Sequence, residues 1–184
     1  MTEQIKTTPM SDADIKKYLP DTKIITYSDL KDYKTLDQLL PNVNDCVIIL
    51  YQTSPNYGHW TGLLKYVDNK NTPIIEYFDS YGHKIDEPLT WVSKKELQKM
   101  GIYEPYLMNL IKKDDKHVVI SNATPLQSSN PDISTCGRYV TGRLIHFIGN
   151  HSTLKTFLKT IKDDKQKMGG NYDDTISRII NKYH

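Results

Sequence analysis

Hydrophobic residues form short runs in the middle of the chain and follow helical periodicity on either side of it. The runs at 45–52, 59–67 and 74–79 are rich in β-branched and aromatic residues and are bounded by turn-forming segments, so we expect three strands. A short polar loop separates the last two, which predicts an antiparallel hairpin. A similar apolar run at 117–121 predicts a fourth strand.

Helix signals occupy most of the other segments. Ser11 and Ser28 stand where the N-cap residues of helices are expected. Helices are expected over these ranges: 11–20, 28–40, 93–100, 104–112, 136–148, 152–165 and 173–181. Helices around one small sheet define an α+β fold, here with a mixed, mostly antiparallel sheet.

The length and the even composition predict a single domain over 1–184. A chain of 184 residues can bury one substantial core, and no repeat or linker divides it. Within this domain we expect a helical N-terminal flank at 1–44, a core at 45–149 that carries the candidate catalytic residues, and C-terminal helices at 150–184.

Charge and cysteine content narrow the function classes. The chain has 24 Lys and Arg against 22 Asp and Glu, a balance that does not favour a nucleic-acid partner, although it leaves one open. No apolar run approaches a membrane span, so no membrane partner is expected. The two cysteines and six histidines lack paired-ligand spacing, which argues against a zinc site. We therefore expect a monomer without a metal or cofactor.

Cys136 is the first candidate for chemistry. It follows a polar loop and opens an amphipathic pattern, so we place it at a helix N-terminus, where backbone N–H groups and the helix dipole favour a thiolate. Taken alone, such a cysteine is more often a small buried residue than a nucleophile. Cys46 lies inside a predicted strand, and we interpret it as a packing residue.

A histidine and a carboxylate supply partners for this thiol. His59 begins one strand of the predicted hairpin and Asp79 ends the other, so pairing of the two strands makes them neighbours. Glu76 is a rival carboxylate, but its position points it to the opposite face of the sheet. A nucleophile, a base and a carboxylate that orients the base are the groups of an activated thiol.

These residues, with two others, occur in an order that resembles the signature of the clan CE cysteine proteases. That group contains the adenovirus maturation protease (adenain), related enzymes of large DNA viruses and virophages, and the SUMO-deconjugating proteases. The resemblance implies a papain-like core with a permuted order of catalytic residues. It rests on four elements in chain order: His59-Trp60, Phe78-Asp79-Ser80-Tyr81-Gly82, Gln127 and Cys136-Gly137.

The resemblance implies a role for each residue that matches the motif. Cys136 would attack a peptide carbonyl, His59 would move the proton, and Asp79 would orient His59. Gln127, with the backbone N–H of Cys136, would stabilise the oxyanion. Residues 128–134 between them would have to loop out.

The resemblance also implies a narrow substrate slot and a class of substrate. Trp60, Gly58 and Gly137 would line the slot, and cleavage would follow small residues, commonly glycine. The expected role is a cysteine endopeptidase that processes viral capsid precursors, acts in the viral factory in the host cytoplasm and is packaged in the virion. Deconjugation of ubiquitin-like proteins and, less in keeping with the sequence, acetyl transfer are the alternatives.

Overall fold

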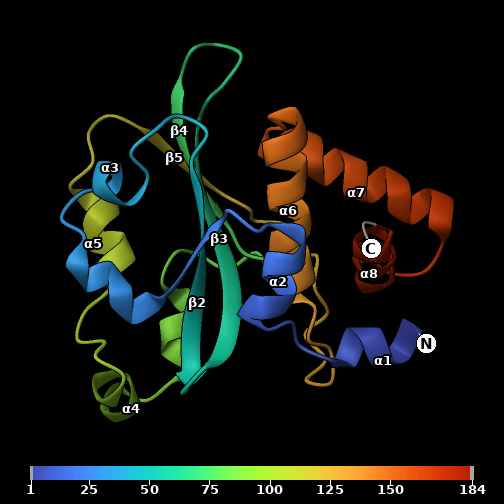
Figure 1. The fold of residues 1–184 in the computed structure, drawn as a ribbon, viewed down its shortest axis with the longest axis horizontal. Coiled ribbons are helices and arrows are strands. Elements are labelled where there is room, and N and C mark those ends of the chain that lie inside the picture. The colour runs from blue at the N-terminus through green and yellow to red at the C-terminus, as the bar shows by residue number, and fades with distance from the viewer. Residues whose placement is uncertain (1, 183–184) are drawn as a thin grey trace.

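The computed structural model describes residues 2–182, with only the backbone described at residues 2–4. A central five-stranded sheet stands between two layers of helices (Figure 1). Helices α6, α7, α8, α1 and α2 lie on one side of it, and α3 and α5 lie on the other. This arrangement confirms the predicted α+β class with a mixed sheet.

The strands follow one another across the sheet in chain order. They are β1 (Lys23–Thr26), β2 (Cys46–Ser54), β3 (Tyr57–Val67), β4 (Pro73–Phe78) and β5 (Val118–Ser121). The central pairings, β2 with β3 and β3 with β4, are antiparallel and long, whereas the four-residue edge strands β1 and β5 pair in parallel. The predicted hairpin is therefore β3 and β4.

The helices match most of the predicted ranges. The α-helices are α1 (Thr2–Thr7), α2 (Asp12–Tyr18), α3 (Leu36–Leu39), α4 (Lys94–Lys99), α5 (Tyr106–Lys112), α6 (Cys136–Asn150), α7 (Leu154–Met168) and α8 (Tyr172–Asn181), and the 3-10 helices are η1 (Tyr27–Asp32) and η2 (Glu87–Trp91). Ser11 caps α2 with a full capping box, as predicted. Across residues 2–182, the helices are all too short or too polar to cross a bilayer.

The N-terminal flank differs from the prediction in two ways. The single helix expected at 28–40 is divided into η1 and α3, because the backbone is extended at Tyr33 and Thr35 and the Thr35 side chain caps α3. Ser28 is not the cap of the first part, since that position belongs to Thr26. The flank also contributes strand β1, which extends the sheet next to β2.

Successive side chains of the central strands point to opposite faces of the sheet and build a hydrophobic core on each face. On β2, Ile48 and Leu50 face the α6 side, while Val47 and Ile49 face the α5 side. A helix on either face covers these residues, so β2 and β3 are buried along most of their length. The sheet therefore offers a rigid support for side chains at its ends.

A buried ion pair fixes α6 to the sheet. Arg143 on α6 donates through Nε and Nη2 to the Glu76 carboxylate on β4, at 2.7 and 2.8 Å, and both side chains are fully buried. Tyr66 and Ser152 complete the hydrogen bonding of this pair. Glu76 thus points to the α6 face, as its position in the strand predicted, and serves the fold there rather than His59.

Candidate active site

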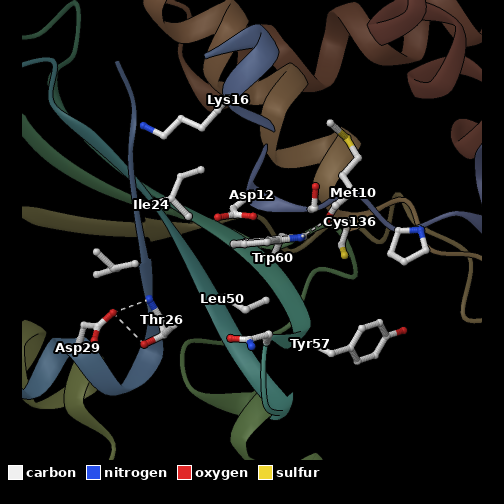
Figure 2. Close-up of a pocket in the computed structure, with 15 residues that line it drawn as sticks. Met10, Asp12, Lys16, Ile24, Thr26, Asp29, Leu50, Tyr57, Trp60 and Cys136 are labelled. Atoms are coloured by element: carbon white, nitrogen blue, oxygen red, sulfur yellow. Dashed lines mark hydrogen bonds between the residues drawn. The ribbon is translucent and has the colours of Figure 1, made fainter. Parts of the chain in front are cut away.

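Cys136 is the first residue of α6, as predicted. The helix is 15 residues long, and its N-terminus is directed at the end of the sheet where β3 begins. The thiol is partly exposed and borders a cavity of about 560 Å³. Trp60 and Gly58 line the same cavity, and Figure 2 shows the indole beside the Cys136 sulfur.

His59 and Asp79 are neighbours, which confirms the geometry inferred from the hairpin. The register pairs Gly62 with Phe78, so the start of β3 runs beside the residue that follows β4. His59 Nε2 lies 3.1 Å from Asp79 Oδ2, and both side chains are buried. Because Nε2 is engaged by the carboxylate, Nδ1 is the nitrogen left to interact with Cys136.

The surroundings of Cys136 favour a thiolate. Burial by itself raises the pKa of the thiol, but a hydrogen bond and the charge of His59 lower it, as do the backbone N–H groups of Trp60 and Gly137. The net effect lowers the Cys136 pKa below its ordinary value. A thiolate held by an imidazolium and two amides is the form that acts as a nucleophile.

The pKa of His59 moves the opposite way. Burial disfavours its charged form, but hydrogen bonds to Asp79 and Cys136 outweigh burial and raise the pKa to about 10. The imidazole is therefore protonated at neutral pH, and its charge favours the thiolate form of Cys136. Cys136 and His59 form an ion pair whose imidazolium can give its proton to a leaving amine.

Asp79 is held in place by bonds that the sequence did not reveal. Its Oδ1 accepts the backbone N–H of Tyr81 at 2.7 Å, and its backbone carbonyl accepts Nδ2 of Asn122 at 2.8 Å. Asn122 follows β5, so this bond ties the end of the edge strand to the backbone of Asp79. Asn122 carries no local signal, because an asparagine after a strand is typical of any turn.

Aromatic rings surround His59. Tyr81 stacks on the imidazole with 5.1 Å between ring centroids, and Trp91 approaches it at 5.3 Å. Trp91 was not predicted as a site residue, whereas Trp60 was predicted to line the substrate slot. Trp60 donates from Nε1 to the carbonyl of Met10 at 2.9 Å and covers the start of α6.

The two glycines predicted to bind substrate lie where neighbouring atoms leave little room for a side chain. A Cβ on Gly58 would lie 2.0 Å from the Tyr51 carbonyl oxygen, next to the β-bulge of β2. A Cβ on Gly137 would meet the Met10 Cβ at 2.8 Å and Trp60 Cδ1 at 3.2 Å. Gly58 lines the cavity, whereas Gly137 is buried beneath Met10 and Trp60.

Gln127 is held beside this group by the Asp79-Ser80-Tyr81 segment. Ser80 Oγ donates to Gln127 Oε1 at 2.7 Å. Gln127 Nε2 donates to the Tyr81 hydroxyl at 3.0 Å and to the Ile133 carbonyl at 3.2 Å. The amide is thus oriented by the segment that carries the Asp79 carboxylate.

Cys46 is in a different environment from Cys136. It begins β2 and packs against the core on the α6 face, as predicted. Burial, followed by the nearby charge of Asp45, raises the pKa of its thiol to about 11. Among residues 2–182, moreover, no three His, Cys, Asp or Glu side chains are grouped so that they could hold a metal ion.

Comparison with known proteins finds one clear sequence relative. No family model matches the chain. The uncharacterized protein V9 of Sputnik virophage is 34% identical over 155 residues, which cover 84% of this chain and 83% of V9. This similarity confirms the expected relation to a virophage protein.

Solved structures with a similar fold have a lower sequence identity to this chain than V9 has. The ASFV protease is 17% identical with a TM-score of 0.42, over 83% of this chain and 66% of that one. The central domain of the uncharacterized Lpg1148 protein from Legionella pneumophila is 14% identical with a TM-score of 0.43, over 95% and 97% of the two chains. The Rickettsia bellii effector protein RickCE is 18% identical with a TM-score of 0.37, over 80% of this chain, which spans about half (54%) of RickCE.

Proposed function

The chain belongs to the family of the Sputnik virophage protein V9, and we propose that it is a cysteine endopeptidase. The proposal rests on the interactions among Cys136, His59 and Asp79. They lower the pKa of the Cys136 thiol and raise the pKa of the His59 imidazole. A buried structural cysteine has no need of a charged partner that is itself held by a carboxylate. This set supports nucleophilic chemistry at a carbonyl.

The reaction follows from the positions of these groups. The Cys136 thiolate attacks the scissile carbonyl carbon, and the oxygen takes the negative charge. His59 then gives its proton to the departing amine, which leaves an acyl thioester on Cys136. A water molecule, deprotonated by His59, attacks the thioester and releases the acid, and Cys136 returns to the ion pair. Asp79 keeps the imidazole oriented through both steps.

The oxyanion needs donors close to Cys136. The backbone N–H at the start of α6 is one such donor, and the positive end of the helix dipole adds to its effect. Gln127 Nε2 is the second. It exchanges its bond to the Ile133 carbonyl, the longer of its two at 3.2 Å, for a bond to the oxyanion.

The cavity beside Cys136 supports a preference for glycine before the scissile bond. Trp60 and Gly58 both line this cavity, and the buried indole lies beside the sulfur, so a branched side chain on the acyl residue would meet the ring. Membership in a virophage family supports a viral substrate. We propose that the enzyme processes capsid precursors in the host cytoplasm, and that it is packaged in the virion.

Peptide mapping of virophage capsid precursors tests this proposal. Incubation with the wild-type protein should produce new termini after Gly-Gly or Ala-Gly, and Cys136→Ala should produce none. A SUMO fusion and an acetyl-coenzyme A assay serve as comparison reactions in the same experiment. Rapid cleavage of the SUMO fusion without cleavage of any precursor would indicate a deconjugase, and acetyl transfer without hydrolysis would indicate an acetyltransferase.

A further inference from the structure

One carboxylate on α8 is bonded to both ends of the loop that separates Gln127 from Cys136. Asp173 Oδ2 accepts the backbone N–H of Ser128 at 3.0 Å, and Asp173 Oδ1 accepts the hydroxyl of Thr135 at 2.5 Å. The Asp173 side chain is buried, with 2% of its surface exposed. A loop with both ends bonded to one rigid group has a fixed span.

The two bonded residues are the neighbours of the two oxyanion donors. Ser128 directly follows Gln127, and Thr135 directly precedes Cys136. The sequence interval between the donors is long, and the hydrogen bonds within it, such as Gln127 Nε2 to the Ile133 carbonyl, do not reach Thr135 or Cys136. The Asp173 carboxylate supplies that connection from outside the loop.

The bond to Thr135 has a second consequence for α6. Thr135 is the N-cap residue, and such a threonine ordinarily turns its oxygen toward the first free N–H groups of the helix. Here the Thr135 side chain makes no capping bond; its backbone is not in the extended conformation usual for an N-cap, and its hydroxyl donates to Asp173. The N–H groups at the start of α6 are therefore left for the thiolate and the oxyanion.

The Asp173 side chain is not needed to cap α8, and α8 packs closely against α6. The N-terminus of α8 is already capped by Asn171 and Asp174, which form a reciprocal capping box. The helix packs closely on α6, since a Cβ added at Gly142 would lie 2.7 Å from Ile176 Cδ1. Asp173 is thus carried by an element that keeps a fixed relation to the catalytic helix.

We propose that Asp173 is a positioning residue that sets the separation of the Gln127 amide and the Cys136 backbone N–H and keeps the start of α6 uncapped. The inference rests on the proposed function, because it concerns the oxyanion site of that reaction. It assigns the C-terminal helix a part in catalysis, although α8 contributes no reacting group.

Turnover and alkylation of a set of variants test the proposal. Asp173→Asn and Thr135→Val each remove one bond from the loop, whereas Thr135→Ser keeps the hydroxyl. Because one lost oxyanion donor lowers turnover by about 10²–10³, a misplaced one should lower kcat by about 10- to 100-fold, with KM changed less than about threefold. Thr135→Ser should keep most of the wild-type kcat, because it keeps the hydroxyl that donates to Asp173. Alkylation of Cys136 by iodoacetamide needs no oxyanion donor and should keep its rate.

Asp174→Asn is the matched control. Asp174 is adjacent to Asp173, pairs with Lys6 and caps α8, but it is not bonded to the loop in the structure. This variant weakens the placement of α8 but keeps both bonds between Asp173 and the loop, so its kcat should fall much less than that of Asp173→Asn. A kcat loss in Asp174→Asn equal to that in Asp173→Asn would assign the effect to helix stability and overturn the proposal.

Two further outcomes bear on the proposal: unchanged kcat in the loop variants, and a wild-type protein that cleaves no peptide. Unchanged kcat in Asp173→Asn and Thr135→Val would overturn the positioning role. If the wild type cleaves no peptide, the proposed function fails, and amide hydrogen exchange then decides whether the loop is held by Asp173. Faster exchange at residues 127–136 in Asp173→Asn would support the loop contact, and unchanged exchange would refute it.

Discussion

The two cysteines should differ sharply in their reaction with iodoacetamide at pH 7. A thiol with a pKa of about 11, as for Cys46, has a thiolate fraction of roughly 10⁻⁴ at that pH. Even at the ordinary value of 9.0, the fraction for Cys136 would be about 10⁻², and its pKa is lower than that. Thiolate content alone therefore favours Cys136 by at least about 100-fold.

The nucleophilicity of the two thiolates reduces this ratio. A thiolate of lower pKa is less reactive, with a Brønsted coefficient of about 0.4–0.5, so two pKa units remove roughly tenfold. The net ratio is at least about tenfold when the Cys136 pKa is just below 9. The ratio rises further as the Cys136 pKa falls further below its ordinary value.

His59→Ala tests the cause of this reactivity. The hydrogen bond and charge of His59 are the largest effects that lower the Cys136 pKa, and without them burial should dominate and raise it. The alkylation rate at pH 7 should then fall by about tenfold or more. Between pH 7 and 9 the wild-type rate should rise less steeply than the variant rate, because the charge of His59, whose pKa is about 10, lowers the Cys136 pKa only in the wild type.

Time-resolved mass spectrometry of the folded protein measures both cysteines in one sample. Cys46 is the internal control, since His59 is not among the groups that shift its pKa. Equal labelling rates of the two cysteines would refute the thiolate at Cys136. A His59→Ala variant that keeps the wild-type rate and pH profile would refute the ion pair.

Three other changes have outcomes that follow from the described contacts. Gln127→Ala should lower turnover by about 10²–10³ in a peptide assay while alkylation continues, and unchanged turnover would assign the oxyanion to another donor. Gly58→Ala should lower stability by at least about 1 kcal/mol in urea unfolding, because its Cβ would overlap the Tyr51 carbonyl. Arg143→Met leaves Glu76 buried without its partner and should cost about 3–5 kcal/mol in the same measurement, whereas a loss below about 1 kcal/mol would show that the pair is dispensable.

The sequence predicted the parts of the site that depend on local structure. The connecting loop of the hairpin fixes the pairing of β3 and β4, and this pairing alone brings His59 to Asp79. Cys136 was found because a helix start can be recognised from a polar loop followed by apolar periodicity. Both inferences use only residues close in the chain, for which hydrophobic pattern and turn chemistry are strong signals.

The missed residues are joined to the site across long stretches of chain. Asp173 is 38 residues from Thr135, and Asn122 is 43 residues from Asp79. In the sequence, Asp173 is indistinguishable from an acidic residue in the first turn of any helix. Trp91 reads only as an exposed aromatic before a helix cap, and its contact with His59 depends on how η2 packs.

Strand β1 was missed for a related reason. It has four residues, it follows a short turn, and it pairs in parallel with β2 across a long connection. Its residues Lys23 and Thr26 are polar and interrupt the apolar run, so the segment lacks the length that marks a strand. Only the exposed edge of β2 makes this segment a strand, and that edge is a property of the folded sheet.

The catalytic helix depends on both ends of the chain. Near the N-terminus, the carbonyl of Lys6 accepts the Ser134 N–H, that of Thr8 accepts Arg138 Nη1, and that of Met10 accepts the Trp60 indole. These bonds place an N-terminal segment across the start of α6, in contact with the loop that Asp173 bonds from α8. The thiol, imidazole and carboxylate come from the central part of the chain, but the backbone around the thiol is held from outside that part. A site of this kind keeps its oxyanion donors in place only when the whole domain is folded, because the groups that hold them belong to the segments that the sequence suggested were peripheral.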